Sequence, residues 1–213
     1  WEVETSKCIA AIEEAHIGTV VSVSYSADGR YIASAGSKDR TVKLWDAQTF
    51  KCLETFQGHT GEISSLSISG DGKYIASAGS SERIVKIWEV QASKLLAPLR
   101  SHNANLNSVS FSSNGRYVAS AGSDDKVKVW DMQTSSCIAT LEGQSGSVTA
   151  VSFTKDGKRI ASAGSSDKLV RVWNAQTFEL LATLEGHTGP VVRVSFSGDG
   201  RYLASGSADK TVK

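Results

Sequence analysis

Residues 31–45 read YIASAGSKDRTVKLW, and residues 74–88 read YIASAGSSERIVKIW. The same pattern returns with small changes at residues 117–130, 159–173 and 202–213. Each copy alternates apolar with small polar residues, which is the period of a β-strand, breaks at a Gly-Ser or similar pair, and then resumes the alternation. The pattern therefore predicts the same pair of antiparallel strands several times along the chain.

The tryptophans set the length of the repeat. Trp1, Trp45, Trp88, Trp130 and Trp173 are separated by 44, 43, 42 and 43 residues. Between them, an Asp-Gly or Asn-Gly pair precedes each YIAS-like segment, which is the strongest short signal for a tight turn between antiparallel strands. Each repeat thus supplies four short strands and no helical pattern. Because one such sheet cannot bury both of its faces, successive copies are expected to stack.

These repeats predict an all-β fold, a β-propeller of four-stranded antiparallel blades in a single domain over residues 1–213, or a part of a larger ring. The repeats are expected to end near the last four tryptophans and at the C-terminus. In the first strand of each repeat the apolar spacing is three and then two, as at Ile63, Leu66 and Ile68. One extra residue in a strand makes a β-bulge, so we expect a bulge near the start of every first strand.

Composition and charge exclude several classes of function. Apolar residues make up 40% of the 213 residues and charged residues 21%, which is typical of a folded domain. The formal net charge of +1 gives no electrostatic footprint for nucleic acid or for an anionic membrane. No apolar run is long enough to span a bilayer. The 3 cysteines do not make a disulfide framework and favour an intracellular, reducing compartment, cytoplasmic or nuclear.

The Gly-His to Trp-Asp pattern, repeated along the whole chain in five consecutive copies, resembles the WD-repeat β-propeller family. The resemblance implies a buried hydrogen-bond chain in each blade, running from an acid through His and Ser to Trp. Carried over to this sequence, that structural network comprises His16, Ser34, Asp39 and Trp45; His59, Ser77, Glu82 and Trp88; His102, Ser120, Asp124 or Asp125, and Trp130; Ser162, Asp167 and Trp173; and His187, Ser205 and Asp209.

Some positions depart from the family pattern. Gln144 stands where the fourth copy would have His, so it offers no imidazole to Asp167, and we expect this blade to fray first. Glu82 is one methylene longer than Asp. The first, second and fourth copies carry one more residue between Ser and acid than the last copy, which predicts a looped-out residue there. In the third copy the register stays open between Asp124 and Asp125.

Repeat phase accounts for the residues that could carry chemistry. All 4 histidines fall at the network position, so we expect no metal site, no cofactor and no catalytic base. Cys8, Cys52 and Cys137 share one position on the fourth strand, where Leu95 and Leu180 stand in other copies, which predicts small buried apolar side chains. Another shared position is basic, and we expect it on a solvated face: Lys43, Lys86, Lys128, Arg171 and Lys213.

The resemblance implies that one narrow face docks partners, and that this face is formed by the loops between fourth and first strands and between second and third strands. We expect partner binding at the positions that differ between copies there: Thr19, Lys38, Glu62, Ser64, Asn105, Asn107, Ser147, Thr149, Pro190 and Arg193.

The expected function is a non-catalytic scaffold or adaptor for other proteins in a larger assembly. The alternatives are a narrow-face module that recognises a modified peptide or nucleic acid, and a sensor module of a larger signalling protein. The lack of aromatic residues at these positions disfavours the recognition module for a modified peptide or nucleic acid, and the balance of charges makes nucleic acid an unlikely partner.

The number of blades in the complete ring stays open. The chain begins at Trp1 and ends at Lys213, one residue before the next tryptophan position. In one interpretation five blades close into a small ring and the two termini share one third strand. In another, which we favour because propellers need closed or protected edges, the chain is part of a larger ring. In a third, several copies of the chain complete one ring as a homo-oligomer.

Overall fold

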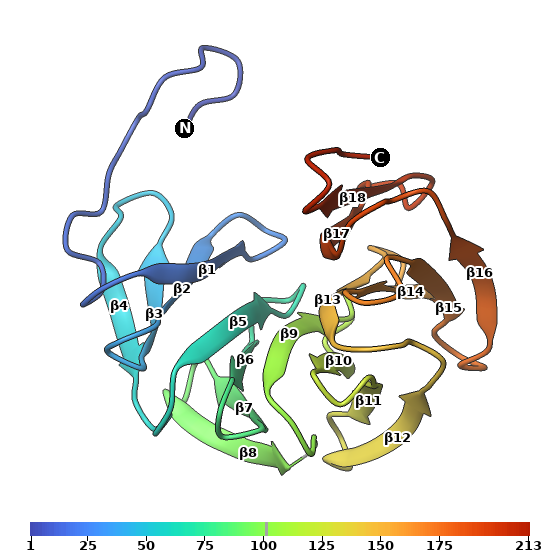
Figure 1. Ribbon diagram of the computed structural model, residues 1–213. Coiled ribbons are helices and arrows are strands. Elements are labelled where there is room, and N and C mark those ends of the chain that lie inside the picture. Colours follow the sequence, from blue (N-terminus) through green and yellow to red (C-terminus); the bar gives the residue numbers. More distant parts are fainter. Residues whose placement is uncertain (101) are drawn as a thin grey trace.

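Each repeat folds into one antiparallel sheet, because the Asp-Gly and Asn-Gly pairs and the Gly-Ser turns reverse the chain at the ends of its strands. The computed structural model describes residues 1–100 and 102–213 (Figure 1). In that part of the chain every regular element is a strand, so the predicted all-β class is confirmed.

Four sheets have four strands and the last has two, in chain order: β1 (Val20–Tyr25), β2 (Tyr31–Gly36), β3 (Val42–Asp46) and β4 (Cys52–Phe56); β5 (Ile63–Ile68), β6 (Tyr74–Gly79), β7 (Ile84–Glu89) and β8 (Lys94–Arg100); β9 (Leu106–Phe111), β10 (Tyr117–Gly122), β11 (Val127–Asp131) and β12 (Ser136–Leu141); β13 (Val148–Phe153), β14 (Arg159–Gly164), β15 (Val170–Asn174) and β16 (Leu180–Leu184); β17 (Val191–Phe196) and β18 (Leu203–Ser207).

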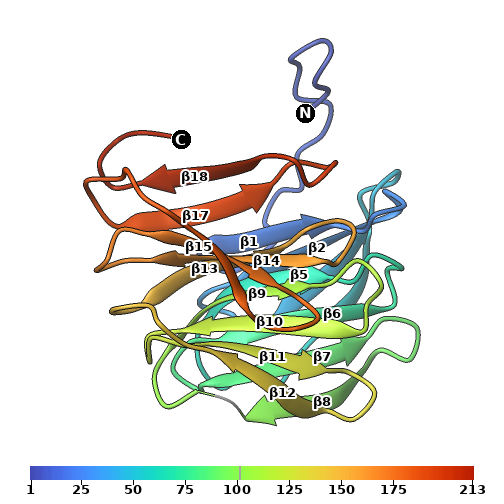
Figure 2. The same cartoon turned by 90° about the vertical axis from the view of Figure 1, so that its right-hand side faces the viewer.

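The sheets are arranged like the blades of a propeller. Their first strands, from β1 to β17, lie around the centre, and the fourth strands β4, β8, β12 and β16 lie at the outside (Figure 1). Seen from the side, the sheets follow one another as stacked layers (Figure 2). The ring is not closed, because the arc is open between the β1 sheet and the β17–β18 pair (Figure 1).

The first and last segments do not share a strand, so the interpretation of a closed five-bladed ring is wrong for this structure. Trp1 is 83% exposed, and its segment pairs only with itself through a bridge between Glu2 and Lys7. Val212 pairs with Gly206 of its own sheet. The expected fourth strand around residues 8–12 is not formed, since no third strand among residues 1–100 and 102–213 lies beside it to complete its hydrogen bonds.

The expected bulge is present in the first strand of every sheet, and this prediction is confirmed. The register shifts between Val20 and Ser22, and at the equivalent points of β5, β9, β13 and β17. A second irregularity, which the sequence did not predict, lies between the third and fourth strands beside the tryptophan of each four-stranded sheet, as between Leu44 and Trp45.

The core lies between successive sheets. Ala33 and Ala35 of β2 are fully buried against Ile63 and Leu66 of β5, and the small alanines let the two sheets approach closely. Burying one such large aliphatic side chain contributes about 1.5–3 kcal/mol. The first sheet lacks this cover on its other face, so Val23 is 67% exposed while its equivalent Leu66 is 4% exposed.

Candidate functional site

Four side chains in the first sheet form a continuous hydrogen-bond chain. Trp45 on β3 donates its indole Nε1–H to the Ser34 Oγ on β2 at 2.8 Å. The Ser34 Oγ lies 2.6 Å from His16 Nε2, and His16 Nδ1 lies 2.8 Å from Asp39 Oδ2. His16 precedes β1 and Asp39 lies in the β2–β3 turn, so the chain ties a loop and a turn to the two middle strands.

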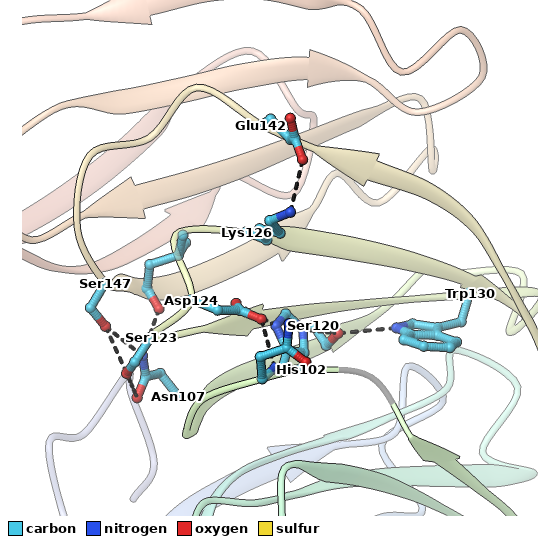
Figure 3. Close-up of polar contacts among 11 residues, drawn as sticks. His102, Asn107, Ser120, Ser123, Asp124, Lys126, Trp130, Glu142 and Ser147 are labelled. Atoms are coloured by element: carbon cyan, nitrogen blue, oxygen red, sulfur yellow. Dashed lines mark hydrogen bonds and ion pairs between the residues drawn. The ribbon is translucent and has the colours of Figure 1, made fainter.

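The second and third sheets repeat this arrangement. Trp88 donates to Ser77 at 2.8 Å, and His59 lies 2.7 Å from Ser77 and 3.2 Å from Glu82. The corresponding contacts of the third sheet are 3.0, 2.9 and 2.7 Å, and they join Trp130, Ser120, His102 and Asp124 (Figure 3).

In the third sheet the structure selects Asp124 over Asp125. Asp124 faces His102, while Asp125 is exposed and has a positive φ of 65°. The turn is short, because the Gly122 N–H already bonds to the Lys126 carbonyl, whereas Gly36 bonds to Thr41. The longer turns of the first, second and fourth sheets hold the extra residue predicted there.

The last sheet contains the network without its tryptophan. His187 lies 2.8 Å from Asp209 and 2.9 Å from Ser205. The Ser205 Oγ therefore lacks the indole donor that the equivalent serines of the first three sheets receive within the described part of the chain.

One protonation pattern satisfies every group of the complete networks. The indole N–H donates to the serine oxygen, the serine hydroxyl donates to His Nε2, and His Nδ1–H donates to the carboxylate. Burial, reinforced by the charge of Lys86, lowers the pKa of His59 to about 4, so this imidazole is neutral. Burial alone would raise the pKa of Glu82, but the Gly61 N–H and Lys86 outweigh it and lower that pKa to about 2.

The Ser-His-acid part of each network has the connectivity of a nucleophilic triad, but its surroundings oppose catalysis. The hydroxyl oxygens of Ser34, Ser77 and Ser120 already accept an indole N–H, and all three serines are buried. A nucleophile needs a free, reachable oxygen. These groups therefore hold strands and turns in place.

The fourth network is incomplete. Gln144 Nε2 donates to Ser162, which also accepts from Trp173 at 2.9 Å. Gln144 Oε1 is buried without a partner among the described residues. Asp167 is held by Arg171 at 2.6 Å and by the Ser145 N–H at 3.2 Å.

Two residues expected on a solvated face are buried instead, which corrects that expectation. Lys86 and Arg171 are each 8% exposed. Lys86 lies 2.9 Å from Glu82 and also bonds to the Gly58 carbonyl, and Arg171 bonds to Asp167. Buried charged side chains are normally paired with a side chain of opposite charge. The acid four residues before each of them was the available signal in the sequence.

The cysteines are exposed, so the expectation of buried apolar side chains is wrong. Cys52 and Cys137 lie on β4 and β12, the outer strands of their sheets, and Cys8 lies in the first segment. No further strand of the described residues pairs with β4 or β12 on that side. Each thiol contacts the carbonyl two residues later, at 3.3–3.5 Å.

The structure brings the predicted partner-binding positions to the same end of every sheet. Together these ends form one face of the arc, which we call the narrow face. In each sheet, a backbone N–H of the turn between the second and third strands donates to a carbonyl of the loop before the first strand, with N···O distances of 2.8–2.9 Å. The accepting carbonyls belong to five predicted positions: Thr19, Glu62, Asn105, Ser147 and Pro190. Lys38 lies in the first of these turns and is exposed.

Three other predicted positions join neighbouring sheets. Ser64, Asn107 and Thr149 donate to backbone carbonyls of the next sheet at 2.8, 2.9 and 2.6 Å. Asn107 also contacts Ser123 and Ser147 at 3.1 and 2.8 Å (Figure 3). Sequence reasoning missed this role; the recurrence of polar residues at one phase was its only signal.

Five predicted positions line one cavity of about 270 Å³ on the narrow face: Ser64, Asn107, Ser147, Thr149 and Arg193, together with Val192. The other five lie outside this cavity.

No cluster of three or more potential metal ligands occurs in residues 1–100 and 102–213. No helix of the described chain has the length and hydropathy to cross a membrane.

Comparison with known proteins identifies the repeat. The family WD domain, G-beta repeat matches residues 6–46, 50–89, 93–131, 135–174 and 178–213. Eukaryotic translation initiation factor 3 subunit I of Culex quinquefasciatus is 37% identical over 57 residues, which are 27% of this chain and 17% of that protein. The chain thus spans less than a fifth of that relative's length. Repeats of this family generally mediate protein–protein interaction.

Proposed function

The chain belongs to the WD-repeat family, and from that premise we propose that it is a non-catalytic scaffold whose narrow face holds protein partners in a larger assembly. The observation that carries the proposal is that two groups of side chains lie in different parts of the structure. The network residues recur at one phase of the repeat and bond to one another between strands, while the predicted partner-binding positions differ between copies and lie at the narrow face.

The absence of catalysis is inferred from the state of the reactive groups. The network histidines each contact Ser and acid partners, and the serine oxygens of three complete networks accept an indole N–H. Side chains that must be free and reachable in an enzyme are thus committed to internal bonds.

Membership of an assembly is supported by the relative from Culex quinquefasciatus, which is named as a subunit of a translation initiation factor. An intracellular, reducing compartment is supported by the exposed thiols of Cys8, Cys52 and Cys137, none of which forms a disulfide.

Site-specific photocrosslinking tests the proposal. A photoreactive amino acid replaces Asn105 on the narrow face, and in a matched variant it replaces Thr140 on the outer strand β12; both residues are exposed. After irradiation in a native extract, discrete protein adducts are expected at Asn105 and not at Thr140. The same adducts at both positions, or adducts at Thr140 alone, would contradict the narrow face as the docking surface.

A further inference from the structure

Four exposed cations share one backbone position on the narrow face. The residue after the network acid has a positive φ in every sheet: 58° at Arg40, 61° at Arg83, 65° at Asp125, 60° at Lys168 and 70° at Lys210. All five side chains are exposed. Four of the five side chains are positively charged, and Asp125 is negatively charged.

The backbone does not explain this choice of residues. A positive φ is strained for residues with a side chain and favours Gly or Asn. The turns between third and fourth strands adopt the same conformation at Phe50, Ser93, Ser135 and Phe178, with φ between 50° and 62°, and none of these is charged. The left-handed conformation therefore does not itself require a charged residue. The cations on the narrow face must recur for another reason.

Arg193 adds a positive charge inside the cavity on the same face. The residues that line this cavity include one cation, four neutral polar side chains and one apolar side chain, and no carboxylate. The donors of Ser64, Asn107 and Thr149 are used by neighbouring sheets. Arg193 bonds only to the carbonyl of Val192, at 3.0 Å, among the described residues. Its remaining N–H groups are open to an anion.

Repeat phase shows that Arg193 is not required by the fold. The equivalent residues, each paired with the Ala or Gly of the second strand, are Ser22, Ser65, Ser108 and Ala150. Ser22 and Ser65 accept a backbone N–H from the next sheet at 3.1 and 3.3 Å. A small residue suffices at this position, whereas the arginine brings a guanidinium.

Resting on the proposed function, we propose that the partner presents an acidic protein segment, with one carboxylate in the cavity against Arg193 and others beside Arg83, Lys168 and Lys210. A guanidinium pairs with a carboxylate through two parallel hydrogen bonds, which fixes the orientation of the bound side chain. A cavity of about 270 Å³ has room for one such side chain. The surrounding cations then attract the rest of the segment.

An acidic peptide fits better than a nucleic acid. The cavity lining has no aromatic side chain on which a base could stack.

Fluorescence anisotropy with the 213-residue chain tests the proposal. The probe is a labelled oligoglutamate peptide, compared with an oligoglutamine peptide of equal length and a single-stranded oligonucleotide of equal charge. We expect the oligoglutamate to bind, to weaken as salt is added, and to bind more tightly than either control.

Matched variants assign the binding to individual positions. R193S, which installs the residue of other repeats, is expected to weaken oligoglutamate binding by about tenfold. The triple variant R83G/K168G/K210G removes charge at positions where glycine relieves strain, and about tenfold weaker binding is expected. D125G removes an acid at the equivalent position and is expected to tighten binding by about threefold. K158S, at the opposite end of a sheet, is expected to change nothing.

The outcomes separate the explanations. Equal binding of the glutamate and glutamine peptides, tighter binding of the oligonucleotide, or weaker binding by D125G would overturn the proposal. Loss of folding cannot imitate the expected gain in D125G, and circular dichroism melts check the other variants. If oligoglutamate fails to bind while crosslinks persist at Asn105, the acidic partner is wrong and the narrow face remains the docking surface. If the same crosslinks form at Asn105 and at Thr140, the proposed function itself is wrong.

Discussion

Gln144 Oε1 and Asp167 Oδ1 both face Gly164, and no hydrogen bond joins the two side chains in the described part of the chain. In the neighbouring third sheet, His102 Nδ1 lies 2.7 Å from Asp124 at the equivalent point. The fourth sheet therefore holds two acceptors where the third holds a donor and an acceptor. An unsatisfied buried acceptor costs free energy, and this difference is open to test.

We expect Q144H to stabilise the protein by about 1 kcal/mol, because the imidazole restores the missing hydrogen bond to Asp167. Thermal and urea unfolding measure the change. The reverse variant H102Q is the control and is expected to destabilise by a similar amount. A lower melting temperature for Q144H would show that Arg171 already satisfies Asp167 fully.

The same difference predicts faster local opening of the fourth sheet. In native-state hydrogen exchange, amides of β13–β16 are expected to exchange faster than those of β9–β12, since both sheets have a neighbour on each side but only the third has a complete network. Finding the fourth sheet to be the more protected of the two would contradict this explanation.

G79A is expected to destabilise the protein by about 2 kcal/mol, because the new Cβ would lie 2.7 Å from His59 Nδ1 and 3.2 Å from the Glu82 carboxyl carbon. Urea unfolding gives the change in free energy. G206A is the matched control: its Cβ meets nothing within 4 Å, so we expect no loss of stability. Equal losses for both variants would point to the backbone instead of the network.

The pH dependence of stability should carry a contribution from His59. Its pKa is about 4 in the folded chain, below the ordinary value of 6.5. Above pH 6.5 neither the folded nor the unfolded chain protonates it, so the stability is unaffected there. Between pH 6.5 and 4 only the unfolded chain takes up the proton, so the free energy of unfolding falls by up to about 3 kcal/mol, at about 1.4 kcal/mol per pH unit.

Urea titrations at several pH values measure this fall. H59Q removes the titrating group, and its stability curve is expected to be flatter than that of the parent chain from pH 6.5 down to 4, although lower at neutral pH. An identical slope in both proteins would mean that the fall comes from other groups.

Thr149 joins the fourth sheet to the fifth through its 2.6 Å bond to the Val191 carbonyl. T149V keeps the shape and removes the hydroxyl, and Val already stands at the equivalent positions 21 and 192. We expect a loss of about 1 kcal/mol and faster hydrogen exchange in β17 and β18. Exchange rates in β1 and β2, far along the arc, serve as the internal control and should not change.

The sequence alone determined the repeating unit. The alternation around Ser34 and the turn at Asp28-Gly29 define strands and reversals that depend on neighbouring residues only. The interrupted spacing at Ile63 and Leu66 predicted the bulge, because side-chain direction alternates strictly along a strand. The position of each tryptophan relative to its serine placed both on adjacent strands.

Only the tertiary structure decided what each face of a sheet meets. Cys52 and Lys86 each belong to a series at a single repeat phase, yet the thiol is exposed on an outer strand and the ammonium is buried beside Glu82. Val23 and Leu66 also share a phase, and only Leu66 is covered by a neighbouring sheet. Periodicity within one sheet specifies which side a residue faces, but burial depends on the element packed against that side, and residues distant in the chain supply it.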